Sequence, residues 1–187
     1  MAASTSRIGS ALGRVWSILL LGLLAGCMTV TMVPPYDEQI DSGLTSLYAD
    51  TSAFVERAVS TAGTPAGSYA ANAGFYDAAS GRVDALIVRA EANQALDNCP
   101  SGKLIDAALA RADLPGDVRA TAAGLAKTDC QVSLLRLIKG GFGRMRQYHQ
   151  LRGANGFFPQ DRGQFLSGGV GAQLRAAITV EVAKRGK

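Results

Sequence analysis

The chain has little of the chemistry from which enzyme sites are usually built. It contains one histidine, three cysteines and 6% aromatic residues in 187 positions. His149 is therefore the single candidate base for a Ser-His-Asp arrangement, and it lies in a basic, glycine-flanked stretch. Paired acids on one helix face, such as Asp77 and Asp84, are typical of solvated surface. We therefore expect no enzyme, no catalytic residues and no cofactor.

Metal sites and membrane-spanning helices are also poorly supported. The cysteines do not form a CxxC pattern, and one histidine does not make a ligand set, so we expect no metal site. The main apolar run, Val15 to Ala25, has 11 residues. A helix needs about 20 predominantly apolar residues to cross a bilayer, so this run is too short for a span.

The first 26 residues have the organisation of an export signal. Arg7 and Arg14 precede the apolar run, and the segment contains no acidic residue. The run ends in Leu24-Ala25-Gly26-Cys27, a leucine and two small residues before a cysteine. A charged start, a short apolar region and small residues at the cleavage site are the parts of a secretory signal.

The tetrapeptide Leu24-Ala25-Gly26-Cys27 resembles the lipobox of bacterial lipoprotein precursors. The resemblance implies cleavage before Cys27 and acyl chains such as palmitate on its sulfur and new amino group. Two or three acyl chains hold a protein stably at a bilayer. Met28 stands where enteric-type lipoproteins retained in the inner membrane carry Asp, which favours the outer membrane. We expect a periplasm-facing location there, with the membrane as a partner and no nucleic acid.

The resulting organisation has three parts. Residues 1–26 are the signal peptide, residues 27–36 are the lipidated cysteine with a Pro-containing tether, and residues 37–187 are one domain. In an oxidising compartment Cys99 and Cys130 form the only disulfide open to the mature domain. Such a bond closes a loop of about 30 residues, which the chain-entropy argument values at roughly 3–4 kcal/mol.

Periodic apolar residues predict four long helices and a short one. The expected long helices cover 37–62, 66–97, 118–139 and 165–185, and the short one covers 103–112. Their predicted buried faces are Ile40, Leu44, Leu47, Thr51, Phe54 and Ala58; Tyr69, Ala73, Tyr76, Ser80, Val83, Ile87, Ala90 and Gln94; Val118, Ala122, Leu125, Val132, Leu135 and Ile138; and Leu166, Val170, Leu174, Ile178 and Val182. We predict an all-α, four-helix up-down bundle. Gly67, Gly74 and Gly81 also recur every seven residues, which would let a neighbouring helix approach closely.

Charge is distributed unevenly along the mature chain. Residues 27–130 hold 7 Lys and Arg against 13 acids, whereas residues 131–187 hold 10 Lys and Arg against two acids. Such asymmetry is a hint of an interaction surface, and equally of two halves that pair across the fold.

The segment 136–152 concentrates the positive charge. Lys139, Arg144, Arg146 and Arg152 are its candidate contacts to an anion or a partner. Phe142, Met145 and Tyr148 equally continue the apolar face of the third helix past a kink. Further along, Phe157 and Phe158 either cap the end of the bundle or form a binding tip.

Two functions follow from these observations. The first is a non-catalytic outer-membrane lipoprotein that docks an envelope protein, as an accessory component. The second is a module that binds an anionic envelope molecule, a lipid or lipopolysaccharide phosphate, through segment 136–152. The sequence leaves the partner and the oligomeric state open.

Overall fold

The computed structural model describes residues 36–94, 110, 115–116, 119–120 and 131–185. All of them belong to one compact unit, Met32–Lys187. The export signal, Cys27 and the tether up to residue 35 lie outside the described residues, as do Cys99 and Cys130. The short helix expected at 103–112 lies outside them as well, apart from Ala110.

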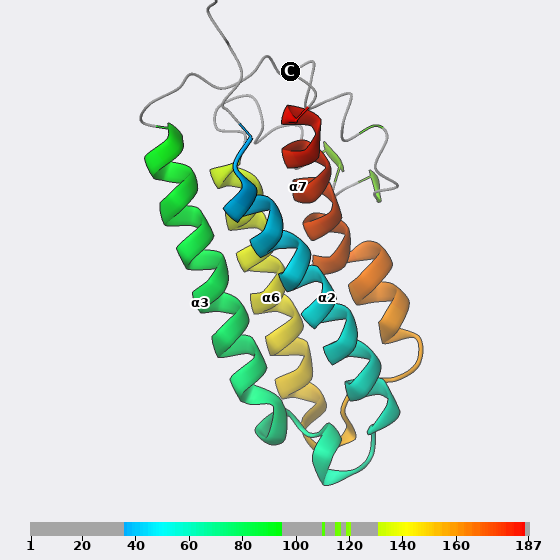
Figure 1. Ribbon diagram of the computed structural model, residues 1–187. Coiled ribbons are helices and arrows are strands. Elements are labelled where there is room, and N and C mark those ends of the chain that lie inside the picture. Colours follow the sequence, from blue (N-terminus) through cyan, green and yellow to red (C-terminus); the bar gives the residue numbers. More distant parts are fainter. Residues whose placement is uncertain (1–35, 95–109, 111–114, 117–118, 121–130, 186–187) are drawn as a thin grey trace, which may run out of the picture. The chain divides into compact units, whose positions relative to one another are not determined.

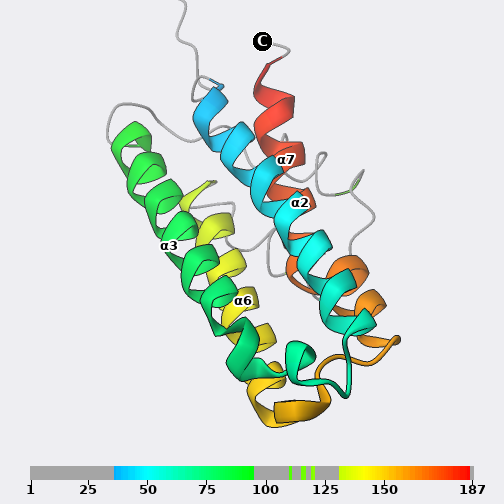
Figure 2. The same cartoon turned by 60° about the horizontal axis from the view of Figure 1, so that its bottom comes forward.

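The described part is all helical, and four helices pack against each other in a bundle (Figures 1 and 2). They are α2 (Glu38–Ser60), α3 (Tyr69–Gln94), α6 (Val132–Arg152) and α7 (Val170–Lys184). Helix α3 packs on α2 and α6, and α7 packs on α2 and α6. Short helical segments, η1 (Pro65–Gly67), η2 (Gly153–Asn155) and the π-helical η3 (Gly163–Gly168), join them. The all-α prediction is confirmed, and no described helix is long and apolar enough to cross a bilayer.

Helix α2 follows the predicted pattern closely. Asp37 caps its first turn, because the Asp37 side chain accepts hydrogen bonds from the amides of Gln39 and Ile40. All six residues of its predicted face are buried. The chain then turns at Gly63, whose φ of 75° is a conformation that glycine adopts without strain.

Helix α3 is present, but its buried face is rotated from the predicted one. The buried residues are Tyr76, Ala79, Val83, Leu86 and Ala90, whereas Ser80 and Ile87 are half-buried at the edge. Small uncharged residues also occupy the side of this helix opposite the core, so spacing alone does not select the inward face.

Helix α6 departs most from the prediction. The expected helix 118–139 is not continuous, because Gln131 forms a turn and α6 begins at Val132. The helix does not end at the glycines, and α6 continues to Arg152. Phe142 and Met145 are buried on the same face as Ile138, and this burial outweighs about 1 kcal/mol of lost helix propensity per glycine.

The packing of α6 against α7 explains why a glycine stands at position 141. A Cβ placed there would lie 2.2 Å from Oε1 of Gln173 and 3.3 Å from Cβ of Val170. Helices α6 and α7 therefore approach each other closely where α6 carries no side chain.

The last predicted helix is divided in two. The π-helical turn η3 precedes α7, because Gly169 interrupts the backbone between them. Val170 and Leu174 are buried as predicted. The predicted burial of Val182 is wrong, because Val182 is 45% exposed and the neighbouring Glu181 is buried instead.

A network of charges fixes the start of α2 to the other helices. Glu181 accepts a hydrogen bond from the Asp37 amide (2.8 Å) and pairs with Lys184 at 2.7 Å, with both side chains almost fully buried. Arg89 donates to the Asp37 carboxylate at 2.7 Å. Burial raises the pKa of Asp37, but the hydrogen bonds from Arg89 and Asn93, together with those from the amides of Ile40 and Gln39, outweigh it and hold that pKa below its usual value. Tyr36, where the described chain begins, thus lies at the same end as the C-terminus of α7.

Candidate functional site

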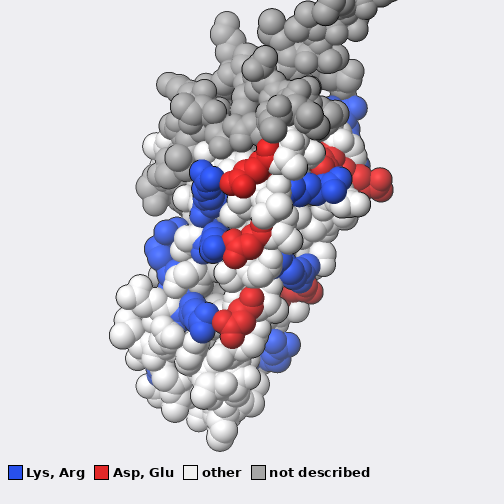
Figure 3. Space-filling view, turned by 90° about the vertical axis from the view of Figure 1, so that its left-hand side faces the viewer, with Lys and Arg blue, Asp and Glu red and all other residues white. Residues whose placement is uncertain are grey.

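Three cations of segment 136–152, Arg136, Lys139 and Arg146, project from one side of α6 toward α3. Lys139 pairs with Asp84 (2.6 Å) and Arg146 pairs with Asp77 (2.8 Å). Arg136 pairs with Glu91 at 2.8 Å one level further along. Figure 3 shows these charges as side-by-side blue and red pairs along one face of the molecule.

These three ion pairs, which we name the α3–α6 ladder, join the basic late part of the chain to the acidic earlier part. Of the two readings of the charge asymmetry, pairing across the fold accounts for these three cations. Every member of the ladder is at least one-third exposed, and such pairs contribute about 0–1 kcal/mol each. Their carboxylates also remain accessible to further cations.

Arg144 is in a different position. It lies on the side of α6 that faces α7, and it pairs with no carboxylate among the residues that the structure describes. When the Gln173 side-chain amide is oriented so that its nitrogen donates to the Leu137 carbonyl oxygen, its oxygen accepts a hydrogen bond from Arg144 at 3.1 Å. Arg144 thus remains available to an anion.

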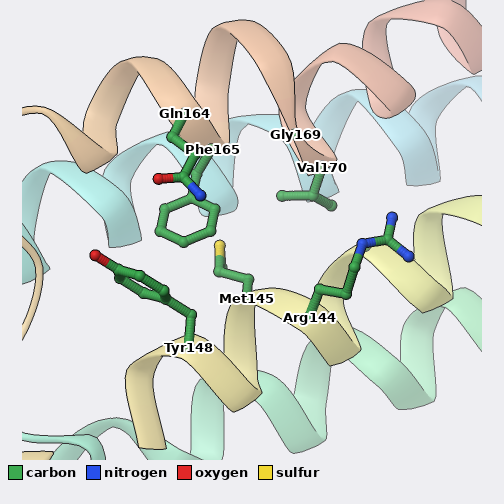
Figure 4. A pocket seen from close by; sticks show the side chains of 8 residues that line it. Arg144, Met145, Tyr148, Gln164, Phe165, Gly169 and Val170 are labelled. Carbon is green, nitrogen blue, oxygen red and sulfur yellow. The ribbon is translucent and has the colours of Figure 1, made fainter. Parts of the chain in front are cut away.

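A cavity of about 220 Å³ opens beside Arg144, between α6 and the η3–α7 junction. Figure 4 shows Met145, Tyr148, Phe165 and Val170 directed toward this space, with Arg144 at one side. Its size compares with the roughly 150 Å³ apolar cavity that holds a benzene molecule. The hydroxyl of Tyr148 donates to Asp161 at 2.9 Å, which fixes one wall.

Arg152 packs at the far end of α6. Its guanidinium lies 3.5 Å from the ring centroid of Phe158. Phe157 is fully buried, whereas Phe158 is 37% exposed. The pair of phenylalanines is therefore split, since Phe157 closes the core and Phe158 stacks with Arg152 at the surface.

His149 is a core residue and does not line the cavity. It has no exposed surface, and its ring lies among Phe54, Tyr76 and Phe157. Nε2 is 3.0 Å from the Gly67 carbonyl oxygen, an acceptor, so Nε2 carries the proton. Nδ1 then accepts from the Tyr76 hydroxyl at 2.8 Å.

Both ring nitrogens of His149 are thus engaged. Burial lowers the pKa of His149 and raises the pKa of Tyr76, so both groups remain uncharged at neutral pH. In the described ranges, no group of three His, Cys, Asp or Glu residues is placed to hold a metal ion.

The most unusual surface lies on α3 and includes Gly74 and Gly81, two of the glycines that recur every seven residues. We name it the outer face of α3, and define it as the exposed residues at alternating steps of three and four: Ala71, Gly74, Ala78, Gly81, Ala85, Val88 and Ala92. The solvent side of a helix usually carries charged residues, whereas none of these seven positions is charged. By contrast, the exposed positions of α2 include Glu38, Thr45 and Glu56.

The glycine spacing predicted a close neighbour, and the described residues do not supply one. A Cβ built on Gly74 or Gly81 would meet none of their atoms within 4 Å. Gly67 differs, because its Cβ would lie 2.2 Å from the Thr61 carbonyl oxygen, so a tight turn requires it. The signal that was missed is the run of alanines interleaved with the glycines of α3.

Comparisons with protein-family models, with curated proteins and with solved structures found no match to this chain.

Proposed function

We propose that the protein is a non-catalytic, lipid-anchored docking or accessory component of the bacterial outer membrane, built as a four-helix up-down bundle with a short additional helix at 103–112. The observation that carries the proposal is the outer face of α3. An exposed helix face of this length without a charged residue is the kind of surface that another helix covers, because extended uncharged patches on a protein surface mark interaction sites. Association through such a face requires no catalytic groups.

The proposed anchor agrees with the position of the domain's first described residues. The acyl chains on Cys27 would hold the protein at the membrane, and the tether up to Tyr36 would enter at one end of the bundle. At that end Asp37 is fixed by Arg89 and Glu181, so a pull on the tether would be transmitted to three helices. We include a Cys99–Cys130 disulfide and a periplasm-facing location in the proposal.

A photocrosslinking experiment in intact cells tests the docking role. A photoreactive residue replaces Ala78 on the outer face of α3, or Ala49 on the exposed side of α2 as the matched control. We expect defined protein adducts from the Ala78 position and none from the Ala49 position. A second change in the same chain, Ala85→Arg, should abolish the adducts, because it places a charge in the contact.

Ala85 is exposed, so this arginine would be solvated in the monomer and the fold should persist. Circular dichroism of the purified variant checks that point. Equal adducts from both positions, or none from either, would contradict docking through α3. A Cys27→Ser variant tests the anchor separately, since it should leave the membrane fraction and lose the mass of the acyl chains.

Binding of an anionic envelope molecule is the second candidate, and Arg144 is the observation in its favour. Arg144 combines a guanidinium without a carboxylate partner in the described part and a cavity with apolar walls. This arrangement suits an amphiphile with an anionic group. Lys139, Arg146 and Arg152 are less suited, because each is already engaged by Asp84, Asp77 or Phe158.

Binding of the lipidated protein to phosphatidylglycerol vesicles or lipopolysaccharide tests this alternative. It predicts affinity that falls with added salt and is lost in Arg144→Gln. Lys139→Gln is the matched control, with the same loss of one charge. Binding that both variants weaken equally would reflect net charge alone and would exclude a specific Arg144 site.

A further inference from the structure

The outer face of α3 has the register of a coiled-coil seam. Its residues occupy alternating a and d positions of a heptad, with Ala71, Ala78, Ala85 and Ala92 at a, and Gly74, Gly81 and Val88 at d. Each interior glycine lowers helix propensity by about 1 kcal/mol relative to alanine. Nothing in the described bundle requires Gly74 or Gly81, because both face open space. A second helix that approaches closely would explain them.

The residues beside the seam carry opposite charges on its two edges. The g positions are Asp77, Asp84 and Glu91. The e positions that follow Gly81 and Val88 are Arg82 and Arg89. Figure 3 shows the result as a band of uncharged surface between a red column and a blue column. Charges at e and g decide which helix pairs with which, and in which direction.

This pattern is complementary to itself in one orientation only. In a parallel pair, each g residue meets the e residue five positions later on the other helix. Asp77 would then meet Arg82 of a second copy, and Asp84 would meet Arg89. In an antiparallel pair the g rows face each other, as do the e rows, so carboxylates would meet carboxylates.

We propose that the outer face of α3 binds a second copy of this chain, helix to helix and in parallel register. The inference rests on the proposed docking function and names the partner for that surface. The charges at the edges are already paired within each copy, Asp77 with Arg146 and Arg82 with Asp50. They remain accessible, because the side chains of Asp77 and Arg82 are 65% and 41% exposed. Contact between copies would therefore extend each row of alternating charge.

The membrane anchor makes the parallel direction the accessible one. Two copies held in one leaflet have their tethers at the same end, so their α3 helices run in the same direction. The seam from Ala71 to Ala92 is about 32 Å long at 1.5 Å per residue, but alanine and glycine bury little area. We expect weak pairing in dilute solution and stronger pairing where the anchors raise the effective concentration.

Cysteine crosslinking of the full lipidated chain in the cell envelope tests the pairing. In a parallel pair an a residue meets its own counterpart, so Ala85→Cys should give crosslinked dimers under mild oxidation. Ala49→Cys on α2 and the unsubstituted chain are controls for the native cysteines. The absence of dimers above those controls would overturn the proposal.

Charge reversal then tests the register. Asp77→Arg or Arg82→Asp alone, in the Ala85→Cys chain, should lower crosslinking about tenfold, which is about 1.4 kcal/mol over two symmetric contacts. The two reversals together should restore it, because opposite charges meet again between copies. Within one copy the double reversal leaves like charges against Arg146 and Asp50, so a purely intrachain role predicts the lowest crosslinking there.

The outcomes separate this inference from the docking function. If the α3 probe captures a different protein while Ala85→Cys gives no dimers, docking stands and self-pairing is wrong. If neither experiment gives a product, both are wrong.

Discussion

Replacement of Tyr76 by phenylalanine should destabilise the domain, although it removes a single oxygen atom. The Tyr76 hydroxyl is the donor to Nδ1 of His149, at 2.8 Å, and both side chains are almost fully buried. In Tyr76→Phe, Nδ1 would lose this donor and keep its lone pair in an aromatic cluster formed by Phe54, Phe157 and the ring at position 76. A buried polar atom without a partner costs about 1–3 kcal/mol.

The expected size is accessible to thermal unfolding. For a domain of about 150 residues or more, 1 kcal/mol moves Tm by roughly 2–4 °C. Tyr76→Phe should therefore lower Tm by roughly 2–12 °C, and lower the free energy of unfolding in urea without changing the slope. The lipidated protein in detergent is suitable for both measurements.

A double-mutant cycle isolates the hydrogen bond from the packing. His149→Leu alone removes the ring and also leaves the Gly67 carbonyl oxygen and the Tyr76 hydroxyl without their partner. Combined with Tyr76→Phe, it should cost less than the sum of the single changes by about 0.5–3 kcal/mol. Additive costs, or a Tyr76→Phe variant as stable as the parent, would refute the description of this buried chain of hydrogen bonds.

Two other predictions follow from the same contacts. Burial lowers the pKa of His149 in the folded state, so the unfolded chain takes up a proton first as the pH falls through about 6.5. The free energy of unfolding in urea titrations should therefore decrease as the pH falls below about 6.5. His149→Leu should remove that decrease, whereas an unchanged profile would contradict it. Gly81→Ala should raise the free energy of unfolding by about 1 kcal/mol, because the new Cβ would meet no described atom within 4 Å. Gly141→Ala should lower the free energy of unfolding, because its Cβ would lie 2.2 Å from Gln173. Equal effects of the two alanines in urea unfolding would contradict the close approach of α6 and α7.

Helix periodicity predicted the architecture best where a helix has one apolar side. Helix α2 alternates buried and polar residues clearly, and each of its six predicted core residues is buried. Helix α3 has alanine and valine outside as well as inside, so the same spacing occurs on two faces. Its inward face depends on contacts with α2 and α6, which the local sequence does not contain.

The basic segment illustrates the opposite limit. Its glycines predicted a break, but Phe142 and Met145 keep α6 helical, because their burial in the core outweighs helix propensity. The sequence also grouped Arg144 with Lys139 and Arg146. The bundle separates them, because α3 brings acids to one side of α6 only. The role of His149 depends equally on Gly67 and Tyr76, which are 82 and 73 positions away.

The proposed docking role requires that the outer face of α3 is covered in the cell envelope. Labelling of Ala85→Cys and Ala49→Cys by a small permeant maleimide measures this coverage, in intact cells and again after the protein is purified and diluted in detergent. We predict that the Ala85 position is protected in cells and reactive after dilution, while the Ala49 position reacts equally in both. Equal and rapid labelling of both positions in cells would show that nothing covers α3, and would contradict the account.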